Sequence, residues 1–132
     1  ALPQSLAALK SLVELTANDN QIAVLPGWVG SLPKLASLDL TRNHIVTIED
    51  DVGASLSLTT LLLAENRLSA VPPLLLQAKS LARMRLEHNM ITKAQLTSTP
   101  GFDEFNQRRE KLVSKQLAGG MTNTDRSICG LD

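Results

Sequence analysis

Apolar residues recur along this chain with a period of 23 residues. In each copy a leucine comes first, a large apolar residue follows three positions later, and a further apolar residue stands two positions after that. An asparagine follows at Asn20, Asn43, Asn66 and Asn89, and an isoleucine or leucine stands two positions after each. The four copies read LVELTANDNQI, LASLDLTRNHI, LTTLLLAENRL and LARMRLEHNMI. Four copies in one register indicate a repeat architecture.

Within each copy apolar and polar residues alternate, as they do in a β-strand that buries one face. We expect the leucines to point inward and the residues between them to point outward. One copy alone cannot bury its apolar face, whereas stacked copies form a continuous core. The pattern therefore predicts a parallel sheet with strands at 13–18, 36–41, 59–64 and 82–87.

The asparagines stand where each strand ends and the chain bends. A side-chain amide has both a donor and an acceptor. It can therefore satisfy backbone groups that would otherwise be buried without a partner. We interpret Asn20, Asn43, Asn66 and Asn89 as structural residues, although they look like a functional row.

These residues resemble the leucine-rich-repeat family, whose repeat reads L-x-x-L-x-L-x-x-N-x-L. The resemblance covers residues 2 to about 96, and segments such as VLPGWVGSLPK look like the short intracellular type with a 23-residue repeat. It implies an α/β fold, a curved right-handed solenoid of about four repeats whose parallel sheet lines the concave side. A helix that caps the C-terminal end is implied as well. Solenoids usually bind other proteins on the concave face.

The solenoid is expected to span residues 1–97 and to begin in the middle of a repeat, because residues 2–10 align with residues 25–33. The first strand then has no polar cap on its N-terminal side. Solenoids need covered ends to stay soluble. We expect this open end to be covered by more of a longer protein, by a partner, or by self-association.

Some positions depart from the repeat. Ala17 and Ala94 stand where large core residues are expected, which predicts thinner packing at both ends. Glu49 replaces a proline, and Leu56 falls one position late. These two departures predict an irregular turn before the third strand.

A helix is predicted within residues 98–120, because the apolar residues there fall largely on one helical face. Those residues are Phe102, Phe105, Leu112, Val113 and Leu117. Thr99 and Pro100 suit the N-cap and the first helical position, and Gly119-Gly120 suits the helix end. We interpret the helix as a cap whose two phenylalanines cover the last repeat.

The alternative is a helix that binds a partner through Arg108, Arg109 and Lys111. The segment GFDEFNQRR resembles tails that follow the repeats in some plant and protist family members, which favours the cap. Residues 121–132 are polar and are expected to form a tail.

Composition limits the classes of function. The 132 residues suit one domain, and 13 Lys and Arg against 13 Asp and Glu leave no net charge. A neutral chain gives no electrostatic reason to bind nucleic acid or an anionic membrane. Cys129 is the single cysteine, and no apolar run reaches membrane-spanning length. Secreted family members usually carry cysteine caps, so we expect a reducing, cytoplasmic location.

The outward strand positions and the residues after each strand form the candidate protein-binding surface. Its members are Glu14, Thr16, Asp19, Ser37, Asp39, Arg42, Thr60, Leu62, Glu65, Arg83, Arg85, Glu87 and His88. Acidic residues gather in its N-terminal half and basic ones in its C-terminal half, which would orient a partner.

Catalysis has little support in the sequence. His44 and His88 are the only histidines, and they occupy different positions of the repeat. No phosphate-binding glycine loop, paired metal ligands or cofactor motif occurs. We therefore expect no enzyme, but a scaffold or adaptor that binds another protein. The alternatives are a structural subunit of a large assembly and a regulatory repeat domain of a larger multidomain enzyme.

Overall fold

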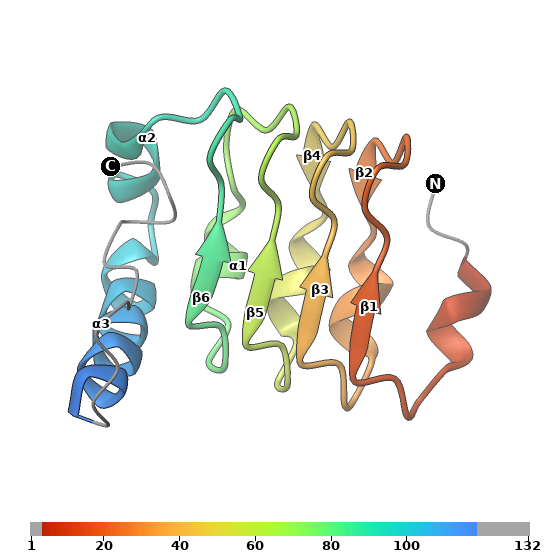
Figure 1. Cartoon of the computed structure of the whole chain (residues 1–132), viewed down its shortest axis with the longest axis horizontal. Helices are drawn as coiled ribbons and strands as arrows, with labels where there is room; N and C mark the ends of the chain where they lie inside the picture. Colours follow the sequence, from red (N-terminus) through yellow and green to blue (C-terminus); the bar gives the residue numbers. More distant parts are fainter. Residues whose placement is uncertain (1–3, 119–132) are drawn as a thin grey trace.

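The computed structural model describes residues 4–118, which stack as short strands and helical turns along one axis (Figure 1). The prefix η denotes a 3-10 helix. In chain order the elements are η1 (Gln4–Ala8), β1 (Glu14–Thr16), β2 (Val24–Leu25), η2 (Gly27–Ser31), β3 (Ser37–Asp39), β4 (Thr47–Ile48), η3 (Asp50–Ala54), β5 (Thr60–Leu62), α1 (Pro73–Leu76), β6 (Arg83–Arg85), α2 (Lys93–Thr97) and α3 (Phe102–Ala118). Gly119-Gly120 and the tail 121–132 lie outside the described residues.

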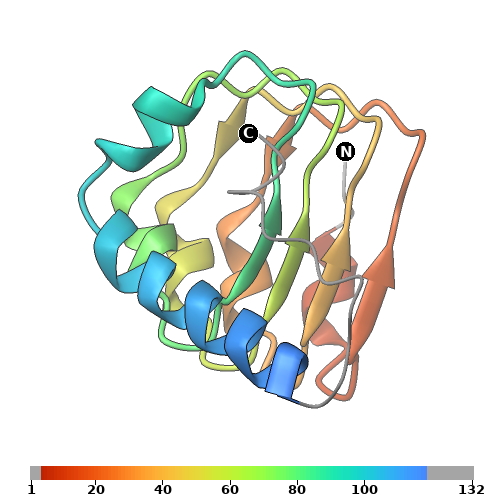
Figure 2. The same cartoon turned by 60° about the vertical axis from the view of Figure 1, so that its left-hand side comes forward.

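The main sheet is parallel, with strand order β1-β3-β5-β6. Its register advances by one repeat per strand, so that Leu15 pairs with Leu38, Leu38 with Leu61, and Leu61 with Met84. A second, two-stranded parallel sheet joins β2 and β4. Figure 2 shows the helical turns behind the main sheet and α3 across the C-terminal end of the stack. The predicted α/β repeat solenoid is thus confirmed, with strands shorter than the ranges predicted.

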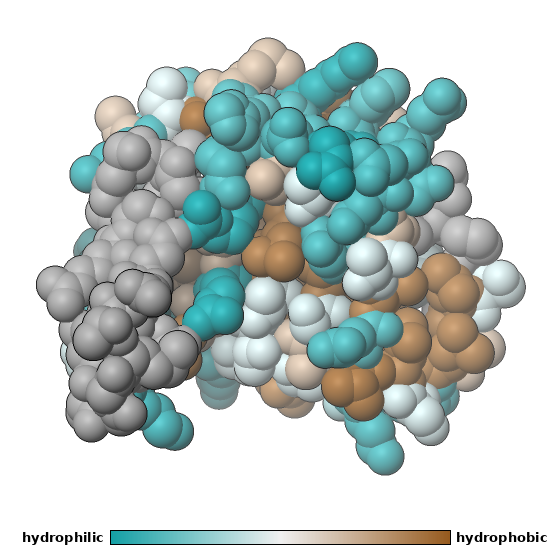
Figure 3. All heavy atoms as spheres, in the orientation of Figure 1, coloured by the Kyte–Doolittle hydropathy of each residue, from teal (hydrophilic) through white to brown (hydrophobic). Residues whose placement is uncertain are grey.

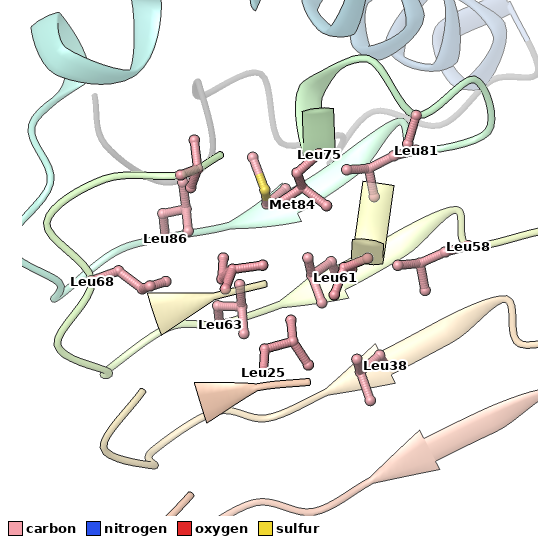
Figure 4. Close-up of a cluster of buried hydrophobic side chains, with 14 of the residues drawn as sticks. Leu25, Leu38, Leu58, Leu61, Leu63, Leu68, Leu75, Leu81, Met84 and Leu86 are labelled. Carbon is pink, nitrogen blue, oxygen red and sulfur yellow. The ribbon is translucent and has the colours of Figure 1, made fainter. Parts of the chain in front are cut away.

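Leucines from every repeat fill the space between the main sheet and the helical turns (Figure 4). Leu38, Leu61 and Met84 occupy one position of successive repeats and are all buried. Ala17 in the first repeat is only half-buried, whereas its counterparts Leu40 and Leu63 are fully buried. Each repeat therefore completes the core of its neighbours.

The buried asparagines tie each repeat to the one before it. Asn66 accepts a hydrogen bond on Oδ1 from the backbone N–H of Ile45 at 3.0 Å. Its Nδ2 donates to the carbonyl of Leu40 at 3.1 Å and to that of Leu63 at 3.0 Å. Asn43 and Asn89 make the same set of bonds one repeat earlier and one repeat later.

Asn20 behaves differently because no strand lies before β1 in the described residues. It is exposed, and its Nδ2 donates only to the nearby carbonyls of Ala17 and Asn18. The interpretation of all four asparagines as partners of buried backbone groups is therefore wrong for Asn20.

The turn before β5 is regular, so the irregular turn predicted there is wrong. Ser55, rather than Leu56, takes the buried position, and its Oγ accepts hydrogen bonds from the backbone N–H groups of Ser57 and Leu58. Leu56 is 82% exposed. Glu49 replaces proline with nearly the same backbone conformation, since its φ of −70° and ψ of 143° compare with −74° and 148° at Pro26. Its carboxylate accepts a 2.6 Å bond from the backbone N–H of Gly27.

A cap covers the C-terminal end of the core. Phe102 and Phe105 are buried in the core cluster, with their ring centroids 6.2 Å apart. Arg108 lies with its guanidinium 6.0 Å from the Phe105 ring centroid and donates to the carbonyls of Leu81 and Leu76. Desolvation lowers the pKa of Arg108, although Glu104 opposes this effect. Arg108 therefore binds the C-terminal helix to the last repeat as part of the cap.

Arg108 takes the place of a serine that donates to an equivalent carbonyl in earlier repeats. Ser57 Oγ donates to the Leu35 carbonyl, and Ser80 Oγ donates to the Leu58 carbonyl, each at 2.7 Å. The next carbonyl in this series belongs to Leu81, and it receives Arg108 Nε at 2.7 Å. Arg108 thus supplies the donor that a serine of a further repeat would supply.

Two predictions near the C-terminal end are wrong: that Thr99 and Pro100 start the long helix, and that Ala94 stands at a core position. The helix α3 begins at Phe102, and the Thr99 hydroxyl donates to the Gln95 carbonyl instead of capping it. A capping box at Thr92 starts the short helix α2 instead. Ala94 in α2 is exposed, and Leu96 is the residue of that helix that enters the core.

We predict that Asn66→Ala lowers the free energy of unfolding by about 1–3 kcal/mol, because the buried Ile45 N–H loses its acceptor and the carbonyls of Leu40 and Leu63 each lose one of two donors. The matched control is Asn20→Ala, which removes only exposed local bonds. Urea unfolding of both variants measures the difference. Equal losses would contradict the proposed bonding between repeats.

We predict that Phe105→Ala costs about 3–5 kcal/mol, because the ring is fully buried between α3 and the last repeat. Lys111→Ala, in the exposed part of the same helix, is the control. Thermal melts of the two variants compare them, and a Phe105 variant as stable as the control would exclude the cap.

Candidate protein-binding surface

The predicted surface residues lie on one side of the main sheet, which we call the strand face. It consists of the outward side chains of β1, β3, β5 and β6 and of the residues after each strand. Because the strands are in register, Thr16, Asp39, Leu62 and Arg85 form one row across it. Figure 3 shows hydrophilic atoms along the strand ends and an apolar patch over β5 between them.

The residue before each asparagine has an unusual backbone conformation. Asp19, Arg42, Glu65 and His88 have φ angles of 59°, 58°, 58° and 61°. Residues other than glycine seldom adopt this left-handed region. It turns the chain sharply at the end of each strand, and it places these four side chains in one exposed row, which we call the rim row.

Ion pairs run along the rim row. Arg42 Nε lies 2.6 Å from Asp19 Oδ1, and Arg42 Nη1 lies 3.4 Å from Glu65 Oε2. The hydrogen bond from Arg42 holds the pKa of Asp19 below its ordinary value of 3.8, and the same bond raises the pKa of Arg42. All three side chains are about half exposed, so the pairs add little stability and mainly set the position of the guanidinium.

Asp39 is the most strongly hydrogen-bonded acid on the strand face. Its Oδ1 accepts bonds from the hydroxyl of Thr41 at 2.7 Å and from the Thr41 backbone N–H at 3.1 Å. Asn18 Nδ2 donates to its Oδ2 at 3.3 Å. Burial raises the pKa of Asp39, but the bonds from Thr41 and Asn18 outweigh it, so the pKa is lowered.

Charge is more evenly mixed on the strand face than the sequence indicates. Arg85 Nε lies 3.1 Å from Glu87 Oε2, so a basic residue of the C-terminal half is paired with an acid of that half. Arg42 similarly stands between two acids in the middle of the face. Of the predicted division into an acidic and a basic half, what remains is the contrast between Glu14 and Arg83, which lie at opposite ends of one row.

A shallow hollow of about 380 Å³ lies on the strand face between β5 and β6. It is lined by Thr41, Leu62, Ala64, Glu65, Arg85, Glu87 and His88. Leu62 is half-buried and Ala64 is 8% exposed, so the apolar part of the lining comes from β5 and the residues directly after it. The rest of the lining is polar, and most of its charged side chains form ion pairs.

The structure brings five of the predicted surface residues into the hollow and leaves the others on the rest of the strand face. The candidate residues did not include Thr41 and Ala64, which also line the hollow. Both stand at the repeat position of Glu87, two residues after the row formed by Thr16, Asp39, Leu62 and Arg85. Their shared position with Glu87 is the signal that could have identified them.

Within residues 4–118, no group of three or more metal-binding side chains comes together. Among the helices of the same residues, none is both long and apolar enough to cross a membrane.

The repeat and its geometry agree with the comparisons with known proteins. Residues 11–68 match the leucine-rich-repeat family, and the described part of the chain has the leucine-rich-repeat fold. Its fold is similar to that of a leucine-rich-repeat protein of Leptospira interrogans, with 26% sequence identity and a TM-score of 0.54. That match covers 87% of this chain and 33% of the Leptospira protein, so the chain spans about a third of its length. Curated protein sequences gave no match.

We predict that Thr41→Val raises the pKa of Asp39. The variant loses the hydroxyl donor that lowers this pKa, whereas burial, which raises it, is unchanged. A lowered pKa stabilises the fold above the ordinary value of 3.8, and this contribution is lost as pH falls through the folded value. The variant should therefore lose less stability on acidification. Carboxyl carbon NMR titration measures the pKa. Arg42→Ala is the control, since it should raise the pKa of Asp19 more than that of Asp39.

Proposed function

We propose that the strand face binds a protein partner, with the hollow between β5 and β6 as the centre of contact. Leucine-rich-repeat domains generally act in protein–protein interaction, and solenoids commonly use the side lined by strands. The observation that carries the proposal is Leu62, a large apolar side chain half-buried in the floor of a polar surface. Interface centres combine an apolar contact with a polar rim in this way.

The polar groups around Leu62 support the same reading. Glu65 is held by Arg42, and Arg85 by Glu87. A partner would therefore meet side chains that are already positioned, and it would lose less conformational entropy on binding. Arg83 is exposed at the edge of the same face, and its guanidinium suits a carboxylate of the partner.

The role that we propose is that of a scaffold or adaptor in the cytoplasm. The concave surface of the solenoid, which the repeat predicts, would surround part of the partner. The remaining charges, with Glu14 at one end and Arg83 at the other, would favour one docking direction.

We predict that Leu62→Ala weakens binding of the partner by at least tenfold, because apolar area at the centre of the contact is lost. Leu74→Ala is the matched control, since Leu74 is a half-exposed leucine in α1, away from the strand face. Proteins retained by the immobilised chain are identified by mass spectrometry. Binding of the purified partner to both variants is then measured by calorimetry.

The double variant Arg83→Ala, Arg85→Ala should weaken the same binding by roughly 2 kcal/mol or more if either arginine is a hot spot. Its melting temperature should barely change, because both side chains lie on the surface. A partner that binds both strand-face variants as well as the original chain, or that is lost with Leu74, would exclude the strand face as the binding site.

A further inference from the structure

Two charges beside Leu62 are not compensated by an ion pair. Asp39 and Arg85 are the Cα partners of Leu62 on the neighbouring strands, so these three residues lie in one row across β3, β5 and β6. Arg85 pairs with Glu87. Asp39 and Arg83, in contrast, form no ion pair within residues 4–118. An acid and a base without a counter-charge therefore flank the apolar centre of the strand face, one on each side.

Arg83 lies within reach of the β6 end of this row. It stands two residues before Arg85 on the same side of β6, because the side chains of a strand alternate between its two faces. Its side chain is exposed, and its planar guanidinium matches the geometry of a carboxylate. A carboxylate held over the β6 end of the row would therefore meet Arg83, with Arg85 beside it.

One oxygen of Asp39 is only weakly held. Oδ1 accepts both bonds from Thr41, whereas Oδ2 accepts a single bond of 3.3 Å from Asn18 Nδ2. In this arrangement Asn18 Oδ1 is buried and has no hydrogen-bond partner in the described part of the chain. A buried acceptor without a donor costs free energy. A cationic donor that binds Asp39 Oδ2 would release the Asn18 amide to turn its oxygen toward water.

The spacing of these groups matches a helix better than an extended segment. Asp39 and Arg85 are two strand spacings apart, or roughly 9.6 Å. Residues three, four and seven apart lie on one face of a helix, and seven residues rise about 10.5 Å. Three side chains on one face of an extended segment span about 13 Å. A helix laid across the strands therefore places three successive side chains over the row.

We infer that the partner bound by the strand face is an amphipathic helix that crosses the strands and carries a basic, an apolar and an acidic residue in that order on its contact side. The basic residue lies over Asp39, the apolar residue enters the hollow beside Leu62, and the acidic residue meets Arg83. The opposite orientation would bring like charges together. This inference rests on the proposed function and specifies the kind of partner.

The experiment uses three short peptides that a covalent bridge on the far side holds helical. The contact side of the first carries lysine, leucine and glutamate, with the leucine four positions after the lysine and the glutamate three positions after the leucine. The two controls carry lysine, leucine and lysine, or glutamate, leucine and glutamate, at the same positions. A helix can lie in either direction along the row, so same-sign peptides are better controls than a reversed sequence. Amide chemical shifts of the whole chain give the dissociation constants and the place of binding.

The lysine–leucine–glutamate peptide should bind about tenfold more tightly than either control, because each control brings one pair of like charges together. The side-chain amide signals of Asn18 should shift with both lysine-containing peptides and stay in place with the glutamate–leucine–glutamate peptide. Arg83→Glu should transfer the preference to the lysine–leucine–lysine peptide. The matched control is Lys79→Glu, the same change of charge at an exposed position in the turn before β6, which should leave the order of affinities unchanged.

Three results would overturn the inference: no binding of the first peptide, equal binding of all three, or equally tight binding of an extended peptide with the same three residues. The proposed function is tested separately, by the effect of Leu62→Ala on the captured partner. A partner that depends on Leu62 but not on the charges of Asp39 and Arg83 would leave the strand face as the binding site and remove only the charged helix as its occupant.

Discussion

The bonds of the buried asparagine amides hold the rest of the structure in place. A strand of three residues makes few hydrogen bonds, and the sharp bend after it turns backbone groups into the interior. The amide of Asn66 donates to the carbonyls of Leu40 and Leu63 and accepts from the N–H of Ile45, so its partners belong to two adjacent repeats. Core packing and strand register can then repeat every 23 residues, because each bend is closed in the same way.

Because every unit depends on its neighbours, the ends of the stack need other solutions. At the C-terminal end two phenylalanines replace the next set of leucines, and Arg108 replaces the next serine donor. The substitutes differ in chemistry from what they replace but meet the same carbonyl and cover the same apolar surface. At the N-terminal end η1 extends only the helical layer.

Periodicity made most of the fold predictable from the sequence. Leu38, Asn66 and the parallel strands follow from one spacing, since each position is seen four times. The C-terminal helix, which occurs once, was predicted from its own apolar face, but other features that occur once were missed. The start of α3 depends on how the chain leaves α2, and the buried Ser55 depends on two backbone N–H groups that no pattern displays. The strand-face residues were predictable as positions, whereas the pairing of Arg85 with Glu87 depends on rotamers.

The rim row separates the shape of the chain from its chemistry. Aspartate, arginine, glutamate and histidine occupy the same left-handed backbone conformation there, with φ values within a few degrees of one another. The conformation is therefore imposed by the bend and its asparagine, not by the side chain that adopts it. Because these four side chains are exposed, a library that varies them among polar residues would change the charge of the strand face and leave the backbone conformation in place.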